Sequence, residues 1–98
     1  MTNRPTALVT GAGKRIGRAV SMALAKNGWD VAVHYNQSAD EALSLKAEIE
    51  AQGAEAVIVQ ADLLLEDETS SLVERAAEAM KRPLTALINN ASTFEHDD

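Results

Sequence analysis

The chain has no cysteine, and this absence excludes disulfides, thiolate chemistry and cysteine-based zinc sites. Its 9 basic residues are outnumbered by 15 acidic ones, and the net charge of −6 argues against nucleic acid or an anionic membrane as a partner. No apolar run approaches the roughly 20 residues that span a bilayer. The N-terminal segment has one basic residue and a short apolar run, unlike a signal peptide. We therefore expect a cytoplasmic protein.

Strand-like and helix-like segments alternate along the 98 residues, a length that suits one small domain. Four short, apolar, β-rich runs predict buried strands at residues 6–10, 30–35, 56–60 and 86–89. Helical patterns lie between them. This alternation predicts right-handed βαβ crossovers and an α/β fold. We expect the first half of a Rossmann-type, doubly wound parallel sheet, with four strands and three helices, which is incomplete without C-terminal elements.

Apolar spacing places the three helices and their buried faces. The first is expected over residues 15–27, ending at Gly28, and the second begins at Ser38 in a capping box with Glu41 and ends at Gly53. The acidic residues 65–71 are turn-like, and Pro83 terminates the third helix. The buried residues expected are Ile16, Ala19, Val20, Ala23 and Leu24 in the first helix, Ala42, Leu45 and Ile49 in the second, and Leu72, Val73, Ala76 and Met80 in the third.

The segment LVTGAGKRIGRA, residues 8–19, combines glycines with a strand-to-helix transition. A P-loop is excluded because Leu8 stands where that motif needs glycine and Arg15 where it needs serine or threonine. A dinucleotide-binding turn fits better. Gly11 permits a tight turn, Gly13 a close backbone approach and Gly17 close packing of the helix on the sheet, and the helix N-terminus offers N–H groups to a pyrophosphate. The alternative is a glycine-rich turn without a ligand.

The end of the second predicted strand indicates which dinucleotide is bound. An NAD site needs an acidic residue there, but no carboxylate occurs before Asp40. Arg15 and Ser38 together suit the 2′-phosphate of NADP(H), because a guanidinium is permanently charged and binds phosphate bidentately. Ser38 could instead serve only as a helix cap, and Arg15 and Lys14 could be solvated. We favour NADP(H), with residues 1–98 forming the N-terminal part of a single NADP(H)-binding Rossmann domain.

Two further polar segments follow predicted strands, ADL at residues 61–63 and NNAS at residues 89–92. Ligands of doubly wound sheets bind beyond the carboxyl ends of the strands, so these residues are candidates for contacts. Asp and Asn are also good turn formers, which is the alternative explanation.

The motifs TGAGKRIG, ADL and NNAS, in this order and at these separations, resemble the short-chain dehydrogenase/reductase family. The resemblance covers the whole chain but only the cofactor-binding half of the family's domain. Arg15 replaces the middle glycine of the family's loop, and Ser92 replaces the glycine of its NNAG motif. Together with HYNQS and NNASTF, these departures look like the pteridine reductase branch.

This resemblance implies a set of binding residues. It implies cofactor contacts for Gly11, Arg15, Ile16, Tyr35, Asn36, Ser38, Asp62, Leu63, Asn90, Ala91 and Ser92. Asp62 would bind the adenine amino group, and Asn90 would lie along the ribose on the nicotinamide side. Ser92 would contact cofactor phosphate and substrate, and Phe94 would stack on a pterin ring; ordinary packing is the alternative for Phe94.

The family's catalytic Tyr-x-x-x-Lys pair is absent, because the single tyrosine, Tyr35, is followed at that spacing by Ala39. His34 and His96 have no identifiable catalytic partner, so no catalytic residue is assigned within this chain. We therefore expect the N-terminal part of an NADPH-dependent oxidoreductase that transfers hydride to a small carbonyl or pteridine-type substrate. It would act as a homo-oligomer at full length or with a second chain that supplies the C-terminal half. The alternative is a truncated, non-catalytic nucleotide-binding module.

Overall fold

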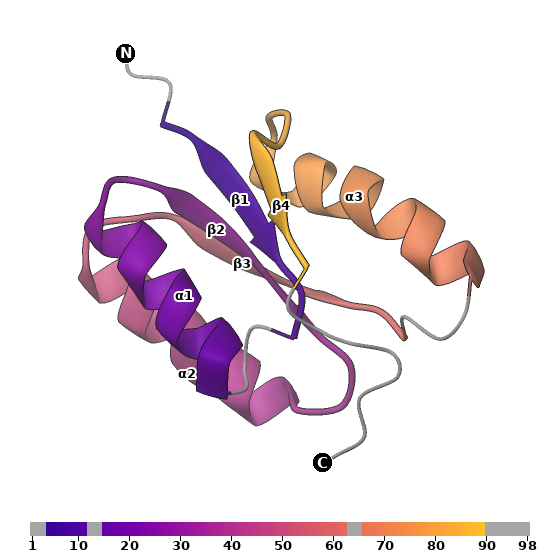
Figure 1. Ribbon diagram of the computed structural model, residues 1–98, viewed down its shortest axis with the longest axis horizontal. Helices are drawn as coiled ribbons and strands as arrows, with labels where there is room; N and C mark the ends of the chain where they lie inside the picture. Colours follow the sequence, from indigo (N-terminus) through magenta and orange to yellow (C-terminus); the bar gives the residue numbers. More distant parts are fainter. Residues whose placement is uncertain (1–3, 12–14, 63–65, 90–98) are drawn as a thin grey trace.

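The computed structural model describes residues 4–11, 15–62 and 66–89. Strands and helices alternate along the described residues, as the sequence predicted (Figure 1). In chain order they are β1 (Thr6–Val9), α1 (Arg15–Lys26), β2 (Asp30–Tyr35), α2 (Ala39–Ala51), β3 (Ala56–Gln60), α3 (Glu66–Met80) and β4 (Ala86–Ile88).

The four strands form one parallel sheet in the order β3-β2-β1-β4. Leu8 of β1 lies opposite Ala32 on one side and Leu87 on the other, so β1 occupies the interior of the sheet. The chain moves outward from β1 to β3 and then returns to the other side of β1 with β4. This order is the first half of a Rossmann-type sheet, which confirms the predicted fold class.

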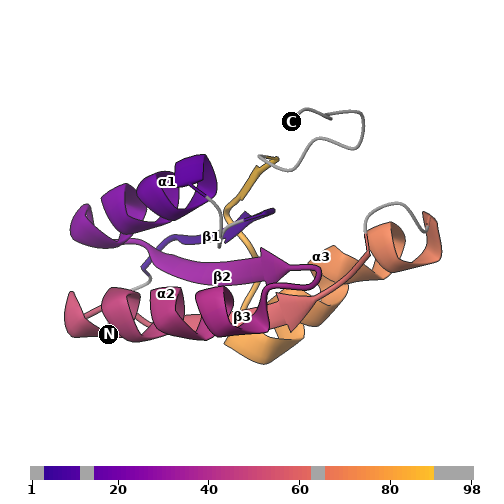
Figure 2. The same ribbon diagram turned by 90° about the horizontal axis from the view of Figure 1, so that it is seen from below.

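Helices cover both faces of the sheet. Helices α1 and α2 lie beside each other on one face and α3 lies on the other (Figure 1). Figure 2 shows the strands separating α1 from α3. Because strand side chains alternate between faces, Val31 and Val33 of β2 point toward α1 and α2, and Ala32 points toward α3.

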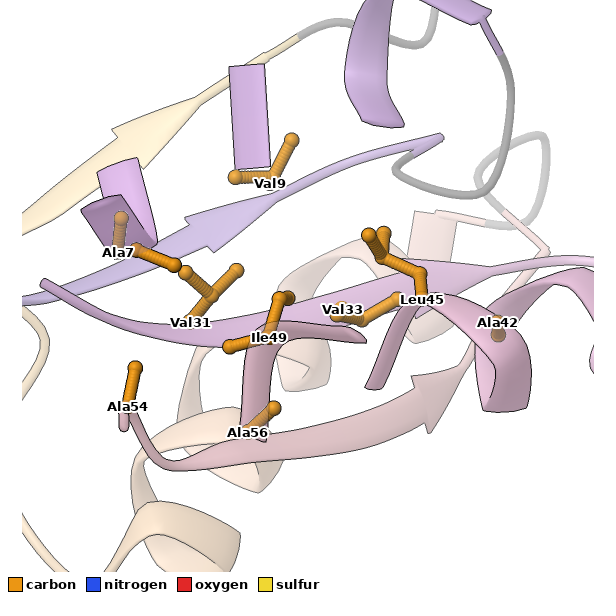
Figure 3. Close-up of a cluster of buried hydrophobic side chains, with 10 residues drawn as sticks. Ala7, Val9, Val31, Val33, Ala42, Leu45, Ile49, Ala54 and Ala56 are labelled. Atoms are coloured by element: carbon orange, nitrogen blue, oxygen red, sulfur yellow. The ribbon is translucent and has the colours of Figure 1, made fainter. Parts of the chain in front are cut away.

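The larger of the two hydrophobic clusters lies between the sheet and helices α1 and α2. Leu45 and Ile49 of α2 are completely buried and lie against Val31 and Val33 of β2 (Figure 3). The predicted buried face of this helix, Ala42, Leu45 and Ile49, is confirmed. The second cluster packs α3 on the opposite face and contains Leu8, Ala32, Val59, Ala61, Leu72, Ala76 and Met80.

The buried face of α1 differs from the prediction. Its buried residues are Gly17, Ser21 and Ala25, whereas Ile16 is 69% exposed. The predicted residues Ala19 and Ala23 are exposed, and Val20 and Leu24 are half-buried. The buried residues of α1 are all small, and small side chains allow the helix axis to approach the sheet closely. The expected role of Gly17 in close packing is thereby supported.

Two predictions for α3 are also wrong. Residues 65–71 were expected to form a turn, but α3 already begins at Glu66. An acidic composition is compatible with the start of a helix as well as with a turn, so composition alone does not distinguish the two. Val73 is 42% exposed, although the spacing placed it on the buried face with Leu72. Within the described residues, no helix is long and apolar enough to cross a membrane.

A cluster of charged residues joins the elements at the amino-terminal edge of the sheet. The Asp30 side chain, only 3% exposed, accepts hydrogen bonds from Arg4 Nε and from the backbone N–H of Glu55, both at 2.8 Å. Its other oxygen pairs with Arg82, which also donates to Thr6 Oγ1 at 2.9 Å. These bonds connect β1, the start of β2, the segment before β3 and the segment after α3.

Candidate functional site

The carboxyl ends of β1, β2 and β3 bring the first candidate residues to one edge of the sheet. Gly11 follows β1 with a φ of +60°, a left-handed conformation that glycine adopts without strain. Arg15 begins α1 and is exposed, as is Ile16. The tight turn predicted at Gly11 is therefore present. The positively charged Arg15 lies at the N-terminus of α1, the helix that follows this turn.

The second group of candidate residues follows β2. Tyr35 is the last residue of that strand, and Asn36 accepts hydrogen bonds from Gln60 Nε2 at its backbone oxygen (3.0 Å) and its side-chain oxygen (3.3 Å). These bonds tie the segment after β2 to the end of β3. Ala61 continues this link, since its N–H donates to the Tyr35 carbonyl at 3.0 Å.

Ser38 occupies the N-cap position of α2, as predicted, but the capping box does not form. Its φ of −97° and ψ of 63° leave its hydroxyl without a cap hydrogen bond, while its carbonyl accepts from the Ala42 N–H at 3.0 Å. The acidic residues Asp40 and Glu41 lie in the first turn and are favourable there because of the helix dipole. The Ser38 hydroxyl is therefore not committed to capping.

His34 joins the ends of three strands through one side chain that is 2% exposed. Its Nδ1 accepts the Gly11 backbone N–H at 2.9 Å, and its Nε2 lies 2.9 Å from the Ala61 carbonyl oxygen. Burial lowers the pKa of His34 below its ordinary value of 6.5; the backbone hydrogen bond to Ala61 acts in the raising direction, and the charge of Arg75 in the lowering direction. The imidazole is therefore held neutral.

A second side-chain contact fixes the position of β4. Thr10 Oγ1 donates to the side-chain oxygen of Asn89 at 3.1 Å, and the Thr10 N–H donates to the Ile88 carbonyl at 3.0 Å. The beginning of the NNAS segment is thereby attached to the beginning of the glycine loop.

Seven of the predicted contact residues lie at or after the carboxyl ends of strands, or at the starts of helices, on the same sheet edge. They are Gly11, Arg15, Ile16, Tyr35, Asn36, Ser38 and Asp62. The remaining candidates, Leu63, Asn90, Ala91, Ser92 and Phe94, lie outside the described residues. Within the described part of the chain, no three His, Asp or Glu side chains gather in a way that could hold a metal ion.

The sequence does not reveal that His34 connects the strands at this edge, and Asn89, a candidate for ligand contacts, instead accepts a hydrogen bond from Thr10. His34 had been considered only as an acid or base without a partner. The available signal was its position, because a polar side chain near the end of a buried strand needs hydrogen-bond partners. Its actual partners lie 23 and 27 residues away in the chain, so spacing alone could not identify them.

Comparison with known proteins adds to this geometry. Residues 5–98 match the family model for short chain dehydrogenases. The 3-oxoacyl-[acyl-carrier-protein] reductase of Synechocystis sp. is 44% identical over 85 residues, which cover 87% of this chain and 34% of that protein. The chain thus spans about a third of the length of the curated relatives it matches.

Two similar solved structures contain a nucleotide. FolM alternative dihydrofolate reductase 1 from Brucella suis, in complex with NADP, has a TM-score of 0.82 and 42% identity, covering 97% of this chain and 37% of that one. A short chain dehydrogenase from Burkholderia cenocepacia, also in complex with NADP, has a TM-score of 0.86 and 40% identity, covering 98% and 40%. Both ligands agree with the cofactor that the sequence predicted.

Proposed function

Because the chain belongs to the short chain dehydrogenase family, we propose that it is the NADP(H)-binding part of a reductase. The intact protein would transfer a hydride from NADPH to a carbonyl or pteridine-type substrate. The observation that carries the choice of cofactor is the exposed Arg15 at the start of α1, together with a Ser38 hydroxyl that makes no cap hydrogen bond at the start of α2.

The chemistry of this edge suits a phosphate on the adenosine ribose. Residues 34–39 contain no carboxylate, so no negative charge there would bind the ribose 2′-hydroxyl in preference to a phosphate or repel a phosphate in its place. Arg15 supplies a permanent positive charge with several donors, and Ser38 lies at a helix N-terminus where N–H groups favour an anion. The NADP-bound neighbours, at 40–42% identity, support the same cofactor.

The remaining residues of the proposed site follow from the same assignment. Gly11 and Ile16 would border the pyrophosphate at the start of α1, Tyr35 and Asn36 the adenosine ribose, and Asp62 the adenine. Leu63, Asn90, Ala91 and Ser92 are proposed as further cofactor contacts. When bound, NADPH would supply the hydride, while the residues of this chain bind and orient it. The Tyr-x-x-x-Lys pair that provides the proton in this family would lie outside the chain.

Two relatives favour different substrates. The Brucella protein is described as a dihydrofolate reductase, which supports a pteridine ring, whereas the Synechocystis protein is a reductase of 3-oxoacyl carrier-protein substrates. The segment NNASTF favours the pteridine, with Ser92 and Phe94 as substrate contacts. If Phe94 stacks on the ring, Phe94→Ala in the intact enzyme should reduce turnover of dihydropterins by about fivefold or more. Unchanged turnover would exclude the stacking role.

The 2′-phosphate role of Arg15 can be measured directly. Arg15→Ala in the intact protein should weaken NADPH binding by about ten- to hundredfold, because a charge-assisted hydrogen bond is worth about 1.5–3 kcal/mol. NADH, which lacks the phosphate, should lose less than about twofold in affinity. Titration of both cofactors by fluorescence gives the two dissociation constants.

A matched control lies one turn further along α1. Arg18 has the same charge but is paired with Glu48 of α2 on the protein surface. Arg18→Ala should leave the preference for NADPH over NADH unchanged. Equal losses for NADPH and NADH in Arg15→Ala would contradict the proposed phosphate contact, whatever the substrate of the enzyme.

A further inference from the structure

We propose that His34 is a positioning residue for the cofactor, whose neutral imidazole holds the beginning of the glycine loop in the geometry that receives the NADP pyrophosphate. Protonation of His34 would release that loop and weaken binding. The inference rests on the proposed NADP(H) site and adds to it a residue that does not contact the reacting atoms. It also gives the site a dependence on pH that the nucleotide alone would not produce.

The two hydrogen bonds of His34 determine its protonation state. The Ala61 carbonyl can only accept, so Nε2 must carry the proton in the 2.9 Å contact between them. The Gly11 backbone N–H can only donate, so Nδ1 must present its lone pair. A neutral imidazole with its proton on Nε2 satisfies both partners, and no other form does.

The contact with Gly11 lies where the loop leaves the sheet. Gly11 directly follows Thr10 after β1 and adopts a φ of +60°. Its N–H belongs to the peptide that joins Thr10 to Gly11, so the hydrogen bond that this N–H donates to His34 fixes the orientation of the first peptide of the loop. A loop whose first peptide is already fixed loses less conformational entropy when a ligand binds. Both the affinity for the nucleotide and the stability of the fold should therefore depend on this hydrogen bond.

Protonation of the His34 imidazole would disrupt only one of its two hydrogen bonds, the one that it accepts from Gly11. In the imidazolium both ring nitrogens are donors, so the bond to Ala61 survives and Nδ1–H faces the N–H of Gly11. This donor–donor contact would push the loop away from the sheet. The surroundings disfavour the charged form, because the ring is buried on the face covered by α3, from which Arg75 contributes a positive charge.

Among the described residues, few charged side chains other than Arg75 lie near the imidazole of His34. On the β1 side its described neighbours are Thr10 and Gly11, which do not titrate. On the β3 side His34 lies opposite Val59 and contacts Ala61, neither of which titrates, and the half-buried Asp62 follows in the chain. Arg75 itself donates to the Gln60 carbonyl at 2.9 Å and so stays beside this edge. Helices α1 and α2 cover the opposite face of the sheet.

The coupling between protonation of His34 and binding of NADP⁺ is reciprocal. If only the form with neutral His34 binds NADP⁺ well, then bound NADP⁺ must lower the pKa of His34 by an equivalent amount. The negative charge of the nucleotide alone would act in the opposite direction and raise it. A decrease would therefore identify the coupling through the loop, and a purely structural histidine would not show it.

Two substitutions separate the contacts of His34. In His34→Asn the side-chain oxygen can take the place of Nδ1 and accept the Gly11 N–H, and it cannot be protonated. In His34→Gln the side-chain amide can take the place of Nε2 and donate to Ala61, but the acceptor that Nδ1 offers to the Gly11 N–H is lost. The dissociation constant of NADP⁺ is measured by calorimetry for the intact wild-type protein and both variants, between about pH 5 and about pH 8.

In the wild type we expect NADP⁺ affinity to fall with decreasing pH by about fivefold to tenfold more than in His34→Asn. The decline common to both reports protonation of the 2′-phosphate, whose second pKa is about 6. His34→Gln should bind about tenfold more weakly than wild type near pH 8, without the additional decline. Urea midpoints of the three proteins separate these affinities from losses of stability.

The same linkage can be observed in the wild type alone. Nitrogen NMR of the imidazole should give a pKa for His34 that is lower with saturating NADP⁺ than without it. An unchanged or raised pKa, or identical pH profiles for the wild type and His34→Asn, would overturn the inference and leave the NADP(H) assignment intact. Failure of the wild type to bind NADP⁺ at any pH would overturn the proposed function and this inference together.

Discussion

Removal of the buried carboxylate of Asp30 should destabilise the protein more than any other single loss of charge among its described residues. The side chain is 3% exposed and accepts from Arg4, Arg82 and the backbone N–H of Glu55. In Asp30→Ala two guanidinium groups lose their partner, and the Glu55 N–H loses its acceptor. The change therefore affects four segments of the chain at once.

The magnitude follows from the exposure of the partners. Breaking a fully buried ion pair costs about 3–5 kcal/mol, but the arginine side chains are 36% and 32% exposed and can partly rehydrate. We therefore expect a loss of about 3 kcal/mol in the free energy of unfolding for Asp30→Ala. Asp30→Asn keeps one acceptor but turns an amide N–H toward an arginine, and should cost about 2 kcal/mol.

Urea-induced unfolding of the intact protein, followed by circular dichroism, measures these losses as shifts of the midpoint at constant slope. Glu55→Gln is a matched control in the same cluster, because the Glu55 side chain is 53% exposed and pairs only at the rim with Arg82. It should cost less than about 0.5 kcal/mol. NADP⁺ affinity should stay unchanged in all three variants, since Asp30 lies about 13 Å along β2 from His34. A loss below about 0.5 kcal/mol for Asp30→Ala would refute the reasoning.

Two further outcomes can be measured with the same unfolding assay. Leu8→Ala should lower the free energy of unfolding by about 2–5 kcal/mol, because Leu8 is completely buried in an interior strand; a loss below about 1 kcal/mol would contradict that packing. Stability should be complete above about pH 6.5 and decline as pH falls toward the lower pKa of folded His34, since the unfolded chain then binds the additional proton. His34→Asn should lack this part of the pH dependence, and an equal decline in both proteins would contradict it.

Much of the fold could be predicted because the relevant signals are local. The apolar runs at β1, β2, β3 and β4 were placed within a residue of their observed ends, and α2 buried the face that its spacing predicted. Short hydrophobic runs and helical periodicity reflect burial of consecutive or nearly consecutive residues, so they can be recognised without knowing what the elements pack against.

The errors arose where packing partners decide the outcome. Ile16 and Val73 fit a helical apolar stripe but are exposed, because the side of each helix that faces the sheet depends on how the helix is oriented on the strands. In α1 the buried side contains Gly17 and Ser21, which carry little hydrophobic signal. The capping box at Ser38 failed for a related reason, since the path of the chain after β2 fixes its backbone angles.

By itself, the sequence determined the order of strands and helices, the parallel sheet, the glycine turn and the absence of a carboxylate after the second strand. These features depend on residue types at short separations. Only the tertiary structure decided that His34 would connect Gly11 to Ala61, and that Asp30 would pair with Arg82, 52 residues further along the chain. Parallel strands align residues that are far apart in sequence, so the partners of a buried polar group become defined only when the sheet has formed.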